Sequence, residues 1–496
     1  MQRKFWLRFW GVSASAILAV SASGVEAQPY DGAAWLSDYA QLKTIMEKHY
    51  ANLAWFGSPE GGVDIPRLDQ RTLEALKSAR SDEEARQAIT DFVTTFKGGH
   101  FQVLGAVAPA GAKPAEIKRE PFSAADVAEA CAGLGFLPKA QVAFSVPLEG
   151  LPNFTMVSDG LTGVYRAGIV TSTNGTRIGI IRVQNFMLHA FPAACTIGLA
   201  RLKAKGGDID AGGARDAADD EWLNALSEDL KTFKAQGVTV LLVDVGNNTG
   251  GDDDGDMFAR LFTDRLVRSP RLAVAADAAG RAYFDEEISD LDAQIRSGVK
   301  GAGLADLTKA RTFFANARKQ ADTPCDMSWV WKERHAWAGM GCTRMVDAGY
   351  AGGYAATLHQ GAYGDEMTAL RLSLPSRADD HWGLWTGPLY VLTDGRTFSS
   401  AEMFSAVVQD NHIGKTIGQK TGGDGCGFMA DDVPFVLDHS KMRLRVPDCM
   451  RLRADGSNEV PGIIPDIAVL PTEGEDDLQR ANRLIEAVAI DAARER

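Results

Sequence analysis

The spacing of apolar positions changes along the chain and divides it into regions. Between residues 33 and 96 apolar side chains recur every three or four positions, the spacing of amphipathic helices. We expect helices over 33–50 and 67–78, and a third that begins at the capping box Ser81-x-x-Glu84 and ends before Gly98 and Gly99. Residues 28–105 are therefore predicted to form a helical domain whose last helix holds His100 in a fixed place.

Residues 106–176 are rich in Ala, Pro and Gly and contain only short strand-like runs. They predict a small linking β module, without the pattern of a peptide-binding PDZ domain.

Long apolar runs typical of buried strands begin at Arg177. The runs 177–186 and 238–245 are separated by a Gly/Asp-rich stretch, 203–219, which predicts a loop, and by an amphipathic helix over 220–235. A second unit has a strand over 387–394, a helix from about Ala401 and a strand near 415–418. Strand, helix and strand at this spacing predict a parallel sheet covered by helices. The predicted fold class is α/β: a core over 177–480 with a disulfide-closed insertion around 285–350, and a C-terminal helix over 481–496.

The first 27 residues have the features of a secretory signal peptide. Arg3, Lys4 and Arg8 precede a short apolar run, and Val25-Glu26-Ala27 fits a small-x-small cleavage site. The apolar run is shorter than the ~20 residues that span a bilayer, which disfavours an uncleaved anchor helix. We therefore expect export across the inner membrane, to the periplasm.

The net charge and the cysteines indicate which partners, disulfides and cofactors to expect. The formal net charge of -13 argues against partners such as nucleic acid or anionic membrane surfaces. Six cysteines in an exported chain favour disulfides, and nearest neighbours along the chain are the preferred pairs: Cys131–Cys195, Cys325–Cys342 and Cys426–Cys449. No CxxC or HExxH spacing occurs, so neither a metal nor a cofactor is expected.

Two adjacent serines are candidates for a catalytic nucleophile. In TDGRTFSSAEMF (393–404), Ser399 and Ser400 lie between an apolar strand and a helix start, where the first helical N–H groups could stabilise an attacked carbonyl oxygen. The same position suits an ordinary helix N-cap, and this stretch alone leaves both interpretations open.

A glycine pair follows the other buried strand. In LLVDVGNNTGGDDDGD (241–256), Gly250 and Gly251 would let backbone N–H groups approach a ligand closely. The acidic residues after them fit a calcium loop poorly, because Gly250 and Leu261 would take its first and twelfth positions. Acids in the first turn of a helix explain the run better.

Together these stretches resemble a family of serine peptidases that includes the C-terminal processing peptidases, the tricorn core protease and the interphotoreceptor retinoid-binding repeats. The resemblance rests on Asn247-Asn248-Thr249-Gly250-Gly251, Ser399-x-x-Glu402, IGQKTGGDG (417–425), PGIIPDIAV (461–469) and KGGHF (97–101). It covers roughly 177–270 and 385–470, and it implies a crotonase-like (ClpP-like) core behind an N-terminal helical bundle.

The resemblance also implies roles for single residues. The nucleophile lies three residues before the helix-opening glutamate, which is Ser399, and the N–H of Ser400 would form the oxyanion hole with Gly250 or Gly251. The tricorn-like branch takes its base from the N-terminal region and a glutamate from before Gly-x-x-Pro-Asp; these are His100 and Glu459. That branch has a serine before the histidine, where this chain has Gly99.

The processing-peptidase branch uses a lysine about 25 residues after the serine. Asp424 stands at that place, and the nearest lysine is Lys420. We therefore predict an exported peptidase that cleaves peptide or protein substrates through a Ser399–His100 pair. A Ser399–Lys420 dyad, or a non-catalytic ligand- or peptide-binding protein on the same scaffold, remain the alternatives. The sequence does not indicate an oligomeric state.

Overall fold

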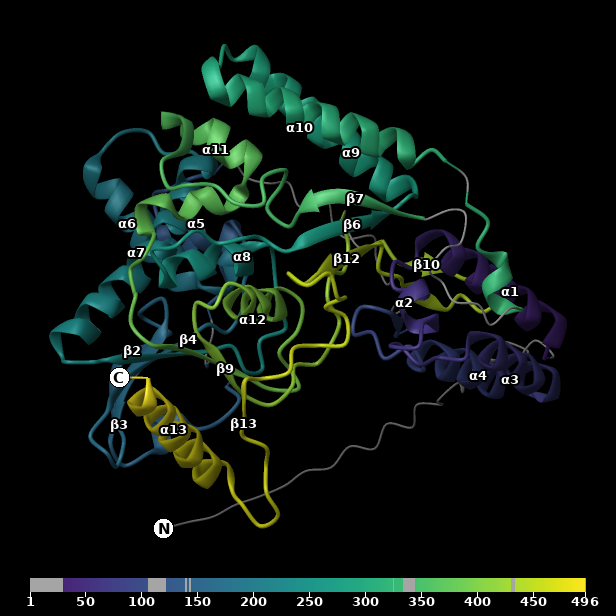
Figure 1. Cartoon of the computed structure of the whole chain (residues 1–496), viewed down its shortest axis with the longest axis horizontal. Helices are drawn as coiled ribbons and strands as arrows, with labels where there is room; N and C mark the ends of the chain where they lie inside the picture. Colours follow the sequence, from purple (N-terminus) through teal and green to yellow (C-terminus); the bar gives the residue numbers. More distant parts are fainter. Residues whose placement is uncertain are drawn as a thin grey trace, which may run out of the picture.

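The computed structural model describes residues 30–105, 122–138, 141, 144–323, 325–332, 344–429 and 433–495 (Figure 1). The predicted signal peptide, residues 1–27, lies outside the described residues. Within the described ranges, no helix combines the length and the apolar character needed to cross a membrane.

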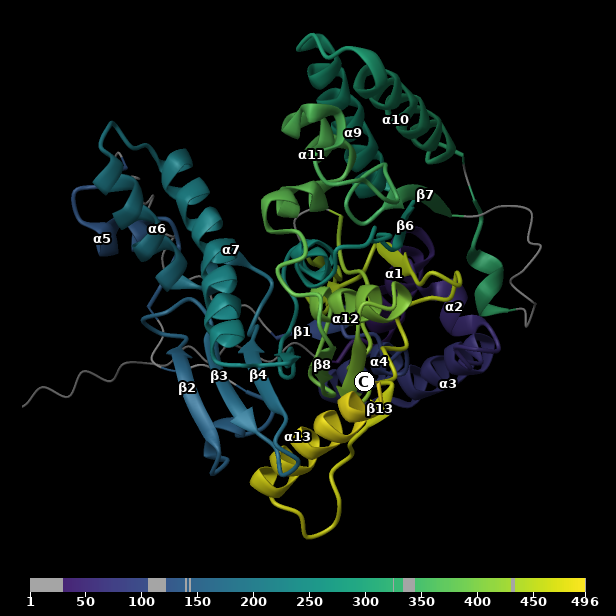
Figure 2. The same ribbon diagram turned by 60° about the vertical axis from the view of Figure 1, so that its left-hand side comes forward.

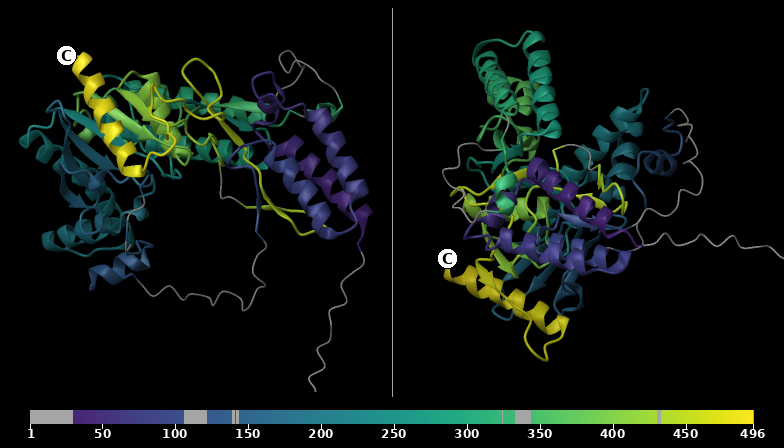
Figure 3. Two further views of the ribbon diagram at one scale, coloured as in Figure 1. Left: turned by 90° about the horizontal axis from the view of Figure 1, so that it is seen from below. Right: turned by 90° about the vertical axis from the view of Figure 1, so that its right-hand side faces the viewer.

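Four helices form the N-terminal region at one end of the molecule (Figure 3). They are α1 (Gly32–His49), α2 (Leu53–Gly57), α3 (Ile65–Ser78) and α4 (Asp82–Thr94). The predicted capping box is present: Ser81 Oγ accepts the N–H of Glu84 at 3.2 Å. Apolar side chains of α1 and α4, such as Tyr39 and Phe92, are buried in one cluster. The predicted helices are thus confirmed.

The centre of the molecule is a seven-stranded sheet with the strand order β13-β9-β8-β5-β4-β3-β2. The strands are β2 (Phe154–Asp159), β3 (Arg166–Thr171), β4 (Arg177–Arg182), β5 (Val240–Asp244), β8 (Leu389–Thr393), β9 (Lys415–Gly418) and β13 (Ile467–Ala468). The five strands from β4 to β13 pair in parallel, as the sequence predicted. The mixed α/β fold class is confirmed.

One predicted boundary is wrong. β2 and β3 were assigned from the sequence to a separate module ending at residue 176, but β2 pairs antiparallel with β3, and β3 pairs antiparallel with β4 in the main sheet. The β2 side chains are partly solvent-accessible, so this edge strand lacks the apolar run that marked its neighbours.

Helices cover both faces of the sheet (Figure 2). Leu241 and Val243 of β5 face a cluster that includes side chains of α7 (Ala211–Ala235), α8 (Asp254–Phe258) and α12 (Ser400–Asp410). The alternating residues Val240 and Leu242 face α13 (Asp477–Arg494). The sequence of a strand buried on both faces is a continuous apolar run, which is why β5 was recognisable in the sequence.

The predicted loop over 203–219 is also wrong. α6 (Pro192–Lys205) extends into it from one side, and α7 begins at Ala211. Asp210 caps α7 by accepting the N–H of Gly213 at 2.8 Å, and Ala214 and Ala218 are buried. Capping and packing therefore outweigh the low helix propensity of the glycines and aspartates. The short α5 (Val127–Gly133) is tied to α6 by the Cys131–Cys195 disulfide.

Two smaller sheets flank the core. One has the order β12-β6-β7, formed by β12 (Cys449–Leu452), β6 (Arg271–Ala275) and β7 (Met345–Tyr350), and packs near α9 (Ala278–Arg296), α10 (Gly301–Gln320) and α11 (Glu366–Leu372). The other joins β1 (Gln102–Leu104) to β11 (Arg443–Arg445) and β10 (Phe435–Val436). The predicted Cys426–Cys449 disulfide is present, and Cys325 is disulfide-bonded while its predicted partner Cys342 lies outside the described residues.

Short 3-10 helices complete the described elements. They span Leu148–Gly150, Leu188–Ala190, Ala259–Phe262, Ser328–Trp331, Ala362–Gly364 and Leu374–His381.

Candidate active site

Ser399 occupies a sharp turn between a strand and a helix. β8 ends at Thr393 and α12 begins at Ser400, so Ser399 stands directly before the first helical turn. Its backbone has φ 53° and ψ -118°, a conformation that costs an L-residue about 1–3 kcal/mol and persists only when the surroundings impose it. The Ser399 N–H donates to Asp424 Oδ1 at 2.7 Å and to Glu402 Oε2 at 3.2 Å. These contacts hold the backbone of the serine in place.

The two adjacent serines have different surroundings. Ser400 is buried, and its hydroxyl accepts the N–H of Gly255 at 3.0 Å. Ser399 is half-buried. The Ser400 side chain is therefore engaged in packing α8 against α12, whereas the Ser399 side chain remains accessible.

The glycine pair lies against this turn. Gly250 has φ 97°, and a Cβ there would lie 2.5 Å from Ser399 Cβ and 3.0 Å from Ser400 N. Only glycine permits this approach. The N–H of Gly250 donates to Asn248 Oδ1 at 2.8 Å, while no acceptor for the Gly251 N–H is found among the described residues. Of the two glycines, Gly251 thus has the amide available to a ligand.

His100 lies beyond the end of α4 and packs against the loop that follows β9. A Cβ on Gly427 would lie 3.0 Å from the His100 ring, and the Phe428 ring contacts the imidazole edge-on at 5.5 Å between centroids. Burial, followed by the charges of Arg445 and Arg451, lowers the pKa of His100 to about 3. The imidazole is therefore neutral at neutral pH, as a general base must be.

A carboxyl group lies beside both residues. Asp424 Oδ2 is 3.2 Å from His100 Nε2, and Oδ1 of the same group accepts the Ser399 N–H. The Ser399 hydroxyl and the His100 imidazole are not hydrogen-bonded to each other, and such contacts often tighten only when substrate binds. Burial, together with the neighbouring Glu402, raises the pKa of Asp424 well above its usual value.

From the sequence, Asp424 was recognisable only as the residue at the position of the family's lysine. The available signals were its spacing from Ser399 and the glycine before His100. A Cβ at Gly99 would lie 2.6 Å from Asp424 Cβ, so the serine that precedes the histidine in the tricorn pattern would clash here. Gly99 and Asp424 therefore fit each other.

Glu402 fixes the loop that carries Asp424. It is fully buried and accepts hydrogen bonds from the Thr421 hydroxyl at 2.6 Å and from the N–H groups of residues 423–425 at 2.8–3.2 Å. The first turn of α12 thus anchors residues 421–425 next to the serine.

Glu459 forms no hydrogen bond or ion pair with His100, and its contacts lead to Ser399 instead. Its Oε1 accepts from Arg451 Nε at 3.1 Å and Nη2 at 2.8 Å, and Arg451 Nη2 also donates to the Ser399 carbonyl at 2.9 Å. Burial raises the pKa of Glu459, against the opposing effect of Arg451. The structure therefore connects Glu459 to the backbone of Ser399 through Arg451.

Lys420 has an exposed side chain, and no hydrogen bond or ion pair joins it to Ser399. Both hydrogen bonds from the Ser399 N–H go to carboxyl groups, and one of these, Asp424, lies beside His100. This arrangement fits the Ser–His alternative better than the Ser–Lys one.

Comparison with known proteins agrees with the architecture. The sequence profile of peptidase family S41 matches residues 177–469, more than half of the chain. Mature CPAF complexed with lactacystin has a similar fold, with a TM-score of 0.58 at 14% identity, covering 93% of this chain and 98% of that one. Mature CPAF alone gives a TM-score of 0.55, also at 14% identity, over 93% and 96% of the two chains. No curated protein matches the chain. The family resemblance inferred from the motifs is confirmed.

Proposed function

The chain belongs to peptidase family S41 and is a serine-type peptidase, and on this premise we propose that Ser399 is the nucleophile and His100 the general base of peptide hydrolysis. The observation that carries the proposal is the constrained turn at Ser399: an accessible serine with positive φ, with Gly250 against its Cβ and Asp424 linking its backbone to His100. Ser399 is also the N-cap of α12, in a capping box with Glu402, but an N-cap requires neither the strained backbone nor the glycine contact.

The proposed reaction forms an acyl-enzyme. Ser399 Oγ attacks the peptide carbonyl while His100 takes its proton, and the N–H groups of Ser400 and Gly251 stabilise the oxyanion. Protonated His100 then donates to the leaving amine, and a water molecule activated by His100 releases the acyl product. Gly250 is not an oxyanion donor, because its own N–H is bonded to Asn248. Its role is steric, since a side chain there would clash with Ser399.

Asp424 and Glu459 are proposed as positioning residues. Asp424 lies next to the imidazole, and its carboxyl group orients the ring. Glu459 orients Arg451, which holds the Ser399 carbonyl.

We further propose export to the periplasm. The signal-like pattern over residues 1–27 and the disulfides support this location, because disulfides persist in oxidising compartments. Cell fractionation with N-terminal sequencing tests it: the predicted mature chain begins at Gln28 and is found in the periplasmic fraction, whereas an intact cytosolic chain would refute it.

Hydrolysis of a denatured protein by wild type, Ser399→Ala and Lys420→Ala tests the reaction. The proposal predicts fragments from wild type and Lys420→Ala but none from Ser399→Ala. Loss of activity in Lys420→Ala would support the dyad. Binding of peptide without turnover by wild type would support the non-catalytic alternative.

A further inference from the structure

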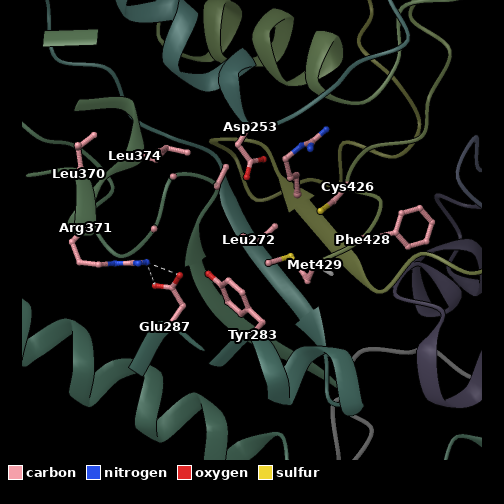
Figure 4. Close-up of a pocket in the computed structure, with 14 residues that line it drawn as sticks. Asp253, Leu272, Tyr283, Glu287, Leu370, Arg371, Leu374, Cys426, Phe428 and Met429 are labelled. Carbon is pink, nitrogen blue, oxygen red and sulfur yellow. Dashed lines mark hydrogen bonds and ion pairs between the residues drawn. The ribbon is translucent and has the colours of Figure 1, made fainter. Parts of the chain in front are cut away.

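A cavity of about 320 Å³ adjoins the proposed catalytic site (Figure 4). It lies between β6, α9, α11 and the loop that follows β9, and its volume is at the lower end of the range for ligand pockets, about 300–1,000 Å³. Apolar side chains form part of its wall: Leu272, Leu370, Leu374, Phe428 and Met429. Such a wall suits the aliphatic part of a peptide side chain.

Two contacts and one short chain segment connect this cavity to the proposed catalytic residues. Arg451 lines the cavity and donates to the Ser399 carbonyl at 2.9 Å. Phe428 lines it and packs against the His100 ring. Asp253 lines it only three residues after Gly250. A substrate held at Ser399 thus has the cavity within reach of its neighbouring side chains.

The Asp253 carboxylate is accessible from the cavity and has no partner among the described residues. Asp253 is solvent-exposed, yet protein atoms surround its carboxylate closely, as expected for a group at the wall of a cavity. Among the described residues no side chain forms a hydrogen bond or ion pair with it, and the charge of Arg451 acts on it without direct contact. Burial raises its pKa to about 6, against the opposing charge of Arg451, so it is largely ionised at neutral pH.

The other charged groups of the cavity are already paired. Arg371 donates to both carboxylate oxygens of Glu287 at 2.7 Å (Figure 4). It also donates to Asp290 at 2.6 Å. Arg451 is paired with Glu459. Asp253 is therefore the carboxylate in this cavity that a cationic ligand would find unpaired.

We propose that this cavity is a substrate subsite that accepts a lysine or arginine side chain, with Asp253 binding the cationic head and the apolar wall contacting the stem. This inference rests on the proposed peptidase function, because it gives that site a substrate class. An aliphatic side chain of equal length would contact the same apolar wall but would leave the Asp253 carboxylate desolvated and unpaired.

Peptide binding to the Ser399→Ala protein tests the subsite without requiring turnover. Fluorescent peptides that carry one lysine or one norleucine at successive positions are compared by anisotropy. We expect lysine to be preferred at one position by about tenfold or more, as for a hydrogen-bonded ion pair. Asp253→Asn should abolish the preference, while Asp252→Asn, a neighbouring exposed carboxylate that does not line the cavity, should retain it. Urea unfolding of each variant verifies that it is folded.

Cleavage of the same peptides by the protein with Ser399 intact tests the subsite separately from the peptidase function. Cleavage with equal kcat/KM for lysine and norleucine, or a preference that survives Asp253→Asn, would overturn the subsite and leave the peptidase function standing. Peptide binding that depends on Asp253 without any cleavage would support the subsite and count against the catalytic proposal.

Discussion

The Asp424 carboxyl group joins His100 to the backbone of Ser399: Oδ2 lies 3.2 Å from His100 Nε2, and Oδ1 accepts the Ser399 N–H at 2.7 Å. Residues far apart in the sequence thus meet at one buried group. Its place, just after β9, is where the related processing peptidases are expected to carry a lysine. In this chain the same place holds a carboxyl group that lies 3.2 Å from a histidine nitrogen.

Replacing Asp424 by asparagine should separate activity from stability. The variant keeps the size of the side chain but replaces the carboxyl group beside His100 by an amide, so kcat should fall about a hundredfold or more. Because burial and Glu402 raise the pKa of Asp424, its ionisation opposes folding, and the free energy of unfolding should stay equal or increase. Peptide hydrolysis and urea unfolding measure the two effects. Asp455→Asn, in an exposed turn, is the control. Full activity in Asp424→Asn would remove Asp424 from the mechanism.

His100 should remain neutral over the physiological pH range. Its pKa of about 3 means that the folded protein does not protonate it near pH 6.5, where the unfolded chain does. The contribution of His100 to stability is therefore present above pH 6.5 and is lost as the pH falls from there towards 3. NMR of protein labelled at the histidine ring nitrogens, assigned with His100→Asn, should show no titration of His100 between pH 5 and 8. A midpoint near 6.5 would contradict the buried, neutral base.

A methyl group at Gly250 should disrupt the catalytic turn. In Gly250→Ala the new Cβ would lie 2.5 Å from Ser399 Cβ, and alanine would have to adopt φ 97°, with a strain of about 1–3 kcal/mol. We expect hydrolysis to be lost and the melting temperature to fall. Gly395→Ala is the matched control, because a Cβ there meets no atom within 4 Å. Wild-type hydrolysis by Gly250→Ala would show that the glycine contact is dispensable.

Arg451 and Glu459 should be strongly coupled. Both are buried and paired, so Arg451→Met alone would leave the Glu459 carboxylate without its partner and should cost about 3–5 kcal/mol of stability. The double variant Arg451→Met/Glu459→Gln should recover much of that loss. Urea unfolding of the wild type, both single variants and the double variant completes the cycle, and additive losses would mean that the pair is not coupled.

The sequence predicted the elements whose signals are local. The Ser81 cap, the apolar run of β5 and the junction at Ser399 each depend on residues close together in the chain, and the structure contains all three. β2 was misplaced because its partly exposed side chains form no apolar run, and it joins the sheet only through the antiparallel pairing of β2 with β3 and of β3 with β4. Asp424 was missed as a partner of His100 because their proximity arises only when the N-terminal region packs against the loop after β9. For the same reason the cavity beside Asp253, which combines α9, α11, β6 and two loops, left no signal in the sequence.

The most direct measurement is labelling of the purified protein with a fluorophosphonate serine probe, followed by mass-spectrometric mapping of the modified peptide. Wild type, Ser399→Ala, Ser400→Ala and His100→Ala are treated side by side. We predict that Ser399 carries the label, that Ser400→Ala is still labelled, and that Ser399→Ala and His100→Ala are not. Labelling that persists in Ser399→Ala, or a folded wild type that does not react at all, would contradict a His100-activated Ser399 nucleophile.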